Sequence, residues 1–486
     1  MASNRIKNQH LLWRAGFGPM AENSASLENF STEKLWEVLI QTSAKKPQKI
    51  EVARSLSDGL VKGVGEIIRM EKPADEKKAI KKKRRQENKE GIASLNLMWL
   101  DTMINSEAQL REKMSFFWHG HFATRVINSY FQQDLLHIIR ENALGNFGEL
   151  LRSVSKSPTM LQFLNNQQNK KSHPNENFAR EVMELFTMGR GNYTEDDIKE
   201  AARAFTGWGF NMQGEFVFRR QFHDEGKKTV LAKSGYFDGD DVLTILLSKR
   251  ETAEFITRKI YRFLVNDNVE ESRVKSLAAD FYDSGYEILP LLHSMVTSDW
   301  FYDEKNIGSK IKSPIELLAG IRRYLPMSLD NDEAQMLFQK VLGQVLFYPP
   351  NVAGWPGGMS WIDSTSLMVR LQVPQVYAAK ESILLTPKID DDVAMGSKME
   401  ETVRINRNKA YVNRGGAADI EWNLIFTAFE KVKRPSLVNA ISNSLVQSPK
   451  SVNPDIITRY SDGSSREAFI KSAVINIMST PEYQMC

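Results

Sequence analysis

The chain has 486 residues, of which 42% are hydrophobic and 26% charged, an ordinary composition for a soluble protein of one large domain or two to three domains. Its 64 basic and 60 acidic residues leave a net charge of +4, which gives no general attraction to nucleic acid or to an anionic membrane. We expect neither as a partner. The single cysteine, Cys486, excludes a disulfide framework and any multi-cysteine zinc or iron–sulfur site.

The N-terminal segment, residues 1–14, is polar and shows no signal peptide, so we expect a cytoplasmic location. A chain whose leader had been trimmed would look the same, and such a protein would be exported. No apolar stretch approaches the roughly 18 residues that a spanning helix needs, so no membrane-spanning segment is expected.

Apolar residues at helical spacing predict an all-α fold with a large multi-helix core and at most a short β-hairpin near 212–222. Thr194 and Asp197 form a capping signal for one of these helices. Residues 386–418 are loop-like, which predicts a main helical domain over 1–390 and a small C-terminal helical extension over 391–486. The predicted helices cover 33–42, 75–105, 107–117, 130–142, 176–188, 195–206, 250–265, 270–283, 313–324, 332–345, 420–430 and 434–446.

A run of seven cations between Lys77 and Arg85 opens the helix predicted over 75–105. Such a run can contact phosphates, but it is more typical of a solvated helix face. It has no neighbouring aromatic residues on which bases could stack, so we interpret it as solvated.

An aromatic run surrounds two histidines, His119 and His121, at the end of the helix predicted over 107–117. Residues two apart on a helix face nearly opposite directions, so these imidazoles could share a ligand only if the backbone opens. Gly120 between them predicts such an opening. The alternative is that one histidine caps the helix and the other is a hydrogen-bonded core residue.

The segment 175–188 carries two carboxylates, Glu181 and Glu184, beside an apolar stripe. Glu181 is expected to be half-buried, with a raised pKa unless a cation or metal compensates it. Arg180 is placed to pair with Glu184 at i, i+4. A structural ion network and a pair of acid–base or metal-binding carboxylates are both compatible with this pattern.

Motifs spread in order from about residue 8 to 375 resemble a bacterial family known as domain of unknown function 1800. The resemblance implies a helix-rich fold and no particular activity, and many members of the family are exported. Gly120 stands where the family more often has Asn, and Asn165 stands where it has Asp, which removes any role that needs a carboxylate at 165. The matching segments are His10–Pro19, Trp118–Phe122, 175–181 with Glu184 and Leu185, 193–195, 202–208, His223 and Asp224, Gly343 and Gln344, and Pro349–Gly358.

The loop Gly354–Gly358 contains Pro and paired Gly, which favour a tight turn. Trp355 and Trp361 could form a stacking wall over a sugar or aromatic group. We favour the simpler interpretation, in which a Trp fixes the loop onto the core.

Imidazoles and carboxylates in these segments favour a metal-dependent enzyme over a non-catalytic helical scaffold with a buried polar network. The metal would be Zn, Mn or Fe, and hydrolysis of a phosphate or sulfate ester the simplest reaction, with non-haem iron redox chemistry as a second option. A small molecule or saccharide is the expected substrate, and the sequence indicates no protein partner. The predicted metal ligands are His119, His121, Glu181 and His223; the predicted catalytic residues are Glu184, Asp224, Arg180 and Arg203; the predicted substrate-binding residues are Trp118, Trp355 and Trp361.

Overall fold

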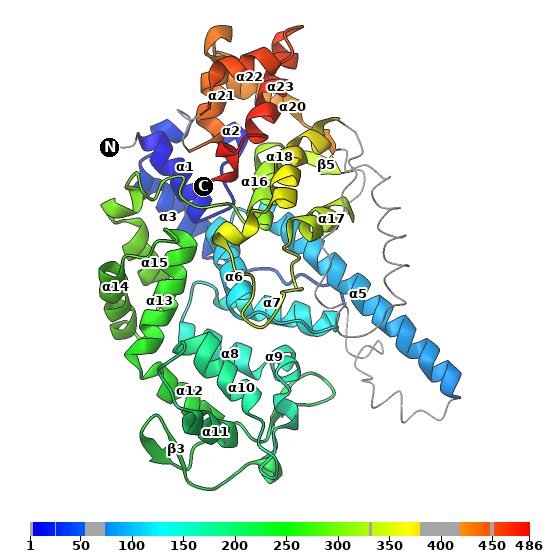
Figure 1. Ribbon diagram of the computed structural model, residues 1–486, viewed down its shortest axis with the longest axis vertical. Helices are drawn as coiled ribbons and strands as arrows, with labels where there is room; N and C mark the ends of the chain where they lie inside the picture. Colours follow the sequence, from blue (N-terminus) through cyan, green and yellow to red (C-terminus); the bar gives the residue numbers. More distant parts are fainter. Residues whose placement is uncertain (1–2, 25, 54–72, 330–332, 380–417, 448–451) are drawn as a thin grey trace.

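The molecule is elongated in this computed structural model, which describes residues 3–24, 26–53, 73–329, 333–379, 418–447 and 452–486 (Figure 1). One end is formed by four helices: α20 (Trp422–Phe429), α21 (Leu437–Leu445), α22 (Pro454–Tyr460) and α23 (Arg466–Met478). The opposite end carries two small hairpins, with strands β1 (Trp208–Phe210), β2 (Phe216–Phe218), β3 (Lys228–Val230) and β4 (Lys233–Gly235).

Helices dominate the described residues, which confirms the predicted all-α fold. The predicted capping box is present, since Thr194 and Asp197 each bond the other's backbone N–H. The first eleven helices in chain order are α1 (Asn4–Arg14), α2 (Ala21–Ser24), α3 (Thr32–Ser43), α5 (Ala74–Asn105), α6 (Gln109–His121), α7 (Ser129–Asn142), α8 (Phe147–Lys156), α9 (Pro158–Phe163), α10 (Glu176–Glu181), the π-helix η4 (Val182–Thr187) and α11 (Glu195–Ala204). Then follow α12 (Gly239–Leu247), α13 (Arg250–Leu264), α14 (Glu271–Asp283), α15 (Ile288–Val296), α16 (Pro314–Tyr324), α17 (Glu333–Leu342) and α18 (Ser364–Ala379), with short 3-10 turns at Leu27–Asn29, Asn166–Gln168, Arg220–Phe222, Asp299–Tyr302, Gly358–Trp361, Arg434–Ser436 and Glu482–Gln484.

The strands of the described residues form three two-stranded antiparallel pairs. Strands β1 and β2 make the hairpin that the sequence predicts, with Gly209 opposite Val217. Strand β3 pairs with β4, and β5 (Met327–Leu329) pairs with β6 (Ala418–Ile420). The last two pairs were not predicted, because three-residue strands carry too few residues to show a period of two.

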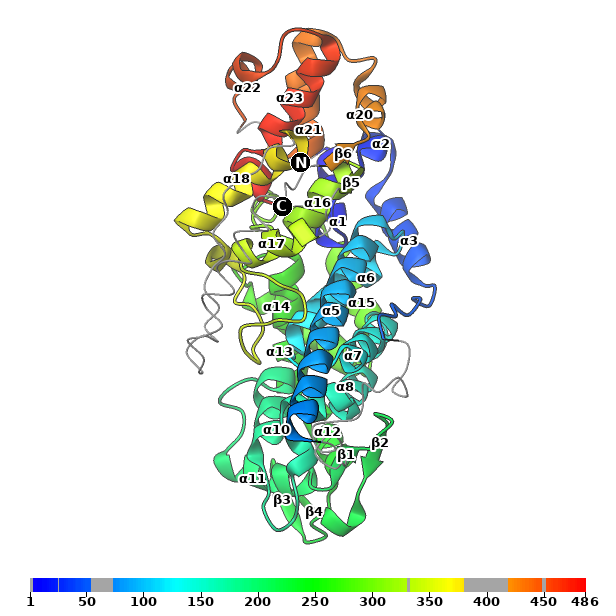
Figure 2. The same cartoon turned by 90° about the vertical axis from the view of Figure 1, so that its right-hand side faces the viewer.

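The long helix α5 has two different halves. Its N-terminal half, which holds the basic run, projects from the body of the molecule into solvent (Figures 1 and 2). Its C-terminal half is buried through Leu95, Trp99, Leu100 and Met103. None of the helices that the structure describes is both long and apolar enough to cross a membrane.

The apolar core divides into clusters. The largest gathers residues from α1 through α15, and a second joins α16–α18 to α20–α23, for example through Leu317, Tyr377, Ile441 and Ile477. Helices that precede residue 380 and helices that follow residue 417 therefore share one core. The predicted domain boundary at 390 lies outside the described residues.

Candidate functional site

The two histidines of the aromatic run lie on one continuous helix. Helix α6 ends at His121 and Gly120 is helical, so the predicted opening of the backbone at Gly120 is wrong. The Nε2 atom of His119 accepts a hydrogen bond from the Phe347 N–H at 3.2 Å, while the Nε2 atom of His121 lies 3.2 Å from the Phe186 carbonyl oxygen. Each imidazole therefore joins α6 to a different segment.

Both imidazoles are held neutral by burial. Burial lowers the pKa of His119 to about 3. Burial also takes the pKa of His121 well below its usual value, and the nearby cation Lys259 lowers it further. The Nδ1 atom of His121 has no hydrogen-bond partner among the described residues. Burial likewise lowers the pKa of Lys259, on α13, to about 8.

Gly120 contributes a close backbone contact rather than flexibility. Its carbonyl oxygen approaches Gly354 so closely that a Cβ atom at 354 would clash with it. Gly354 also has φ +80°, a conformation that favours glycine. The loop that carries Trp355 is thereby seated on the end of α6. Two family segments more than two hundred residues apart meet at this contact.

The three predicted substrate-binding tryptophans occupy different environments. Trp118 is fully buried and its indole N–H donates to the Ala143 carbonyl at 3.0 Å. Trp361 is 7% exposed. Trp355 is half-buried, with its ring centroid 5.8 Å from that of His119 at an interplanar angle of 45°. Trp355 is thus the only one of these three with appreciable solvent contact.

The segment predicted as one helix over 176–188 changes its winding. Helix α10 gives way at Val182 to the π-helix η4, which widens the turn that carries Glu184. Glu184 accepts hydrogen bonds from the Tyr193 hydroxyl at 2.6 Å and from the Arg190 guanidinium. The Tyr193 hydrogen bond, followed by Arg190, holds the pKa of Glu184 below its usual value despite partial burial.

Arg180 does not pair with Glu184, so that prediction is wrong. Its guanidinium donates to Glu195 on α11, at 2.9 and 2.7 Å, and to Glu176 one turn earlier, at 3.2 Å. Glu181 is half-buried, as expected from its place beside the apolar stripe. Burial raises the pKa of Glu181, the like charge of Glu184 raises it further, and Arg180 acts in the opposite direction.

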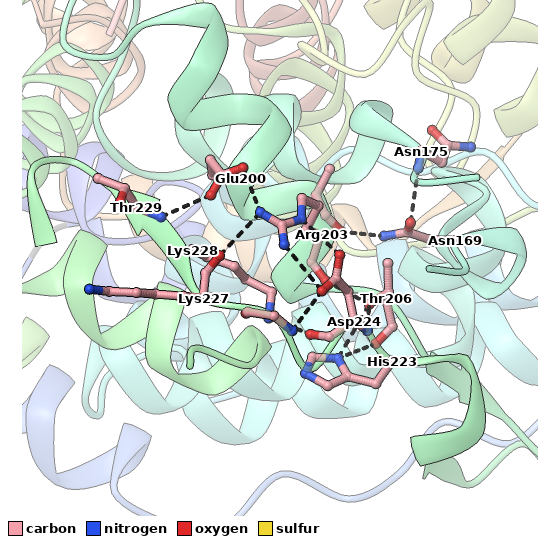
Figure 3. Close-up of polar contacts among 12 residues, drawn as sticks. Asn169, Asn175, Glu200, Arg203, Thr206, His223, Asp224, Lys227, Lys228 and Thr229 are labelled. Atoms are coloured by element: carbon pink, nitrogen blue, oxygen red, sulfur yellow. Dashed lines mark hydrogen bonds and ion pairs between the residues drawn. The ribbon is translucent and has the colours of Figure 1, made fainter. Parts of the chain in front are cut away.

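Arg203, His223 and Asp224 belong to a polar cluster at the hairpin end of the molecule (Figure 3). We call this cluster the hairpin network and define it as Glu200, Arg203, Thr206, His223, Asp224 and Lys228. Arg203 donates from Nε to Asp224 Oδ2 at 2.7 Å, from Nη2 to Oδ1 at 3.2 Å, and from Nη1 to Glu200 at 2.8 Å. Its hydrogen bonds hold the pKa of Asp224 below the usual value.

Backbone contacts complete the hairpin network. The Thr206 hydroxyl donates to the Arg203 carbonyl at 2.6 Å and accepts from the Asp224 N–H at 2.8 Å. His223 Nδ1 lies 3.0 Å from the Thr206 carbonyl oxygen, so the Nδ1–H tautomer donates there. The Lys228 ammonium donates to the Asp224 carbonyl and to that of Gly226. These bonds attach the segment before β3 to the end of α11 (Figure 3).

The four predicted metal ligands are held in separate surroundings. His119 bonds Phe347, His121 bonds Phe186, Glu181 lies among the charges of α10 and η4, and His223 bonds Thr206. Across the part of the chain that the structure describes, no three His, Cys, Asp or Glu side chains are grouped so that they could hold a metal ion. These residues therefore do not fit the predicted ion as they are placed.

A group of buried charges near the N- and C-terminal segments was not predicted from the sequence. Lys113 of α6 forms a buried ion pair with Glu316 of α16. Ser313 and Glu316 form a capping box whose spacing could have been read from the sequence. Nothing local in the sequence signals the burial of Lys113, because its position on α6 alternates with apolar neighbours like any surface lysine.

Comparison with known proteins gives one match. The family model described as "Protein of unknown function (DUF1800)" matches residues 10–485. No curated protein and no solved structure matches the chain. The matched range includes every segment on which the resemblance rests, from His10 to Gly358. This chain belongs to the DUF1800 family, whose function is unknown.

Proposed function

We propose that this protein is a non-catalytic helical scaffold whose polar family segments fix the packing of loops that a partner protein contacts. The observation that carries the proposal is that the charges predicted to do chemistry are already paired with other side chains of the protein. Arg203 is bidentate to Asp224, and Arg180 is bidentate to Glu195. Glu184 accepts from Arg190 and Tyr193. Charge-assisted pairs of this kind fix geometry as well as contributing energy.

The pattern of contacts also supports a structural role. The family segment Trp118–Phe122 bonds to two segments that are distant in the sequence: His119 to Phe347, and His121 to Phe186. Buried polar groups that are satisfied in this way specify one packing arrangement among the alternatives open to an apolar core. The role of the family segments would then be to connect helices to loops through these hydrogen bonds.

Metal-dependent hydrolysis of a phosphate or sulfate ester stays a prediction from the sequence, as does non-haem iron redox chemistry. Both reactions need several donors around one ion. The donor atoms of His119, His121, Glu181 and His223 have the separate surroundings described above. We therefore assign no catalytic step to a metal.

A double-mutant cycle on Arg203→Met and Asp224→Asn tests the proposal. A structural clamp predicts that each single variant lowers the free energy of unfolding by about 1–2 kcal/mol, with a coupling energy of about 1 kcal/mol. Replacing a catalytic residue more often leaves stability unchanged or raises it. Arg220→Met is the matched control, because Arg220 is 82% exposed and pairs only with Glu225 among the described residues. Wild-type stability in both single variants would overturn the proposal.

A further inference from the structure

Five charged side chains lie buried where the N-terminal helix, the C-terminal segment and helices α6, α16 and α18 contact one another. We call them the buried cation cluster, defined as Arg14, Lys113, Lys312, Glu316 and Arg370. Arg14 is 2% exposed, Lys113 is 1% exposed, and Lys312 and Arg370 are fully buried. Long cationic side chains are rarely buried to this degree unless they are paired.

Glu316 is the only carboxylate of the cluster, and both of its oxygens are engaged. Oε1 accepts from the Lys113 ammonium, and Oε2 accepts from the Ser313 N–H at 2.8 Å. Lys113 also donates to the Trp13 carbonyl at 3.0 Å. Burial raises the pKa of Glu316, but Lys113 and the Ser313 bonds outweigh it and bring the pKa to about 2. Glu316 is therefore ionised and already committed to Lys113.

Lys312 is surrounded by rings and carbonyl groups. Its ammonium donates to the Tyr483 carbonyl and lies 3.8 Å from the centroid of the Trp13 ring and 3.7 Å from that of Tyr483. Burial lowers its pKa to about 7, with Cys486 and then Glu316 acting in the opposite direction and Arg370 and Lys113 adding to the lowering.

The two guanidinium groups are incompletely bonded. Arg370 donates from Nη1 to the Lys312 carbonyl at 2.9 Å, while its Nε and Nη2 have no partner among the described residues. Arg14 donates from Nη2 to the Asn306 carbonyl at 2.8 Å and to the Ser309 hydroxyl at 3.2 Å, while its Nε and Nη1 have none. Neither guanidinium donates to a described carboxylate.

Four cations share one side-chain carboxylate, that of Glu316, and the negative group of Cys486, so positive charge is in excess in this buried place. A buried cation without a counter-charge is strongly unfavourable, and an unbonded buried N–H group adds to the penalty. Asp267, which acts on Arg14, is half exposed and pairs with Lys310. The negative group of Cys486 attracts Arg14 and Lys312, and the carboxylate of Glu316 attracts Arg370.

We propose that the buried cation cluster binds a small oxyanion, with Arg370 donating hydrogen bonds to it from Nε and Nη2 and Lys312 contributing charge. Planar guanidinium groups match the geometry of phosphate, sulfate and carboxylate oxygens, and their donors here are the ones that the protein leaves free. The inference is independent of the scaffold proposal, because it concerns none of the residues predicted as metal-binding or catalytic.

Thermal unfolding of the full chain in phosphate tests the proposal. After exhaustive dialysis into Tris chloride, inorganic phosphate at constant ionic strength should raise the unfolding midpoint saturably, by about 2–5 °C. Arg370→Met should abolish the rise, and Arg220→Met, on the surface, should retain it. A midpoint that responds equally to chloride and phosphate, or the same rise in Arg370→Met, contradicts the proposal.

Ion chromatography of the protein, dialysed and then denatured, detects a bound anion that dialysis does not remove. About one equivalent of phosphate, sulfate or a carboxylate per chain supports the proposal, and Lys312→Met should release it if Arg370→Met does not fold. If the wild-type protein shows neither a saturable thermal response nor a retained anion, the proposal is overturned.

Discussion

The hairpin network and the buried cation cluster both gather Arg and Lys around acidic side chains, but they differ in burial and in charge balance. In the hairpin network, Arg203 and Asp224 keep side-chain exposures of 28% and 20%, and Arg203 faces two carboxylates. In the buried cation cluster, Lys113 and Glu316 have side-chain exposures of 1% and 11%, and three further charges are cationic. In the hairpin network the charges are paired within the network, whereas in the buried cation cluster guanidinium N–H groups of Arg14 and Arg370 have no described partner.

This difference bears on how a functional site is recognised. Arg203, His223 and Asp224 of the hairpin network were predicted from the sequence as site residues, but they are hydrogen-bonded to other groups of the protein. The buried cation cluster draws on residues from Arg14 to Arg370, which no local pattern connects. Free donors at a buried position are a better indication of a ligand than the local density of polar residues.

The largest effect should follow from Glu316→Gln. It removes the only carboxylate from among four buried cations, and breaking one partner of a buried pair lowers the free energy of unfolding by about 3–5 kcal/mol. Chemical unfolding measures it, with Glu225→Gln, an exposed partner of Arg220, as the control that should change little. A loss below about 1 kcal/mol would mean that the cluster does not depend on Glu316 for its charge balance.

A smaller loss is expected from Thr206→Val in the hairpin network. The substitution keeps the shape but removes the hydroxyl that accepts from the Asp224 N–H and donates to the Arg203 carbonyl. Leaving that N–H unbonded should lower the free energy of unfolding by about 1–2 kcal/mol. Thr206→Ser keeps the hydroxyl and should therefore keep most of the wild-type free energy of unfolding. Wild-type stability in Thr206→Val would contradict the role given to the hydroxyl.

Lys259 lies outside both regions. It is a half-buried cation without a described carboxylate partner, so replacing it shows how much one such charge lowers the free energy of unfolding. Its folded pKa, about 8, is lower than the unfolded value near 10.4, so the unfolded chain binds more protons between these pH values. Lys259→Met should therefore stabilise the fold by about 1–2 kcal/mol below pH 8. The gain should decline as the pH rises toward about 10.4 and then vanish. Urea unfolding at pH 7 and pH 10 checks this, and a gain that does not depend on pH would contradict it.

The sequence predicted the helical regions well because a helix that packs on the core keeps a regular spacing of apolar residues, and this spacing is visible in the sequence. The range 75–105 became α5, Ala74–Asn105, and 250–265 became α13, Arg250–Leu264. The π-helix at Val182–Thr187 was not predicted, since one extra residue in a turn leaves the apolar pattern almost unchanged.

The candidate site was harder to predict because it depends on side-chain partners that lie far apart in the sequence. Gly120 was expected to end the helix, but it is helical, and the missing Cβ of Gly354 allows the close contact with its carbonyl oxygen. Arg180 had a carboxylate at i+4 and still pairs with Glu195 across to α11. Local spacing identifies which residues can meet, and tertiary packing decides which of them do.

Elemental analysis of protein purified without a histidine tag tests the central claim, that the polar family segments are structural joints, most directly. The account predicts less than about a tenth of an equivalent of Zn, Mn or Fe per chain and no thermal shift when these ions are added. Close to one equivalent of a single metal, released by both His121→Ala and Glu181→Gln while helical content is retained, would contradict it and restore the metal-enzyme prediction.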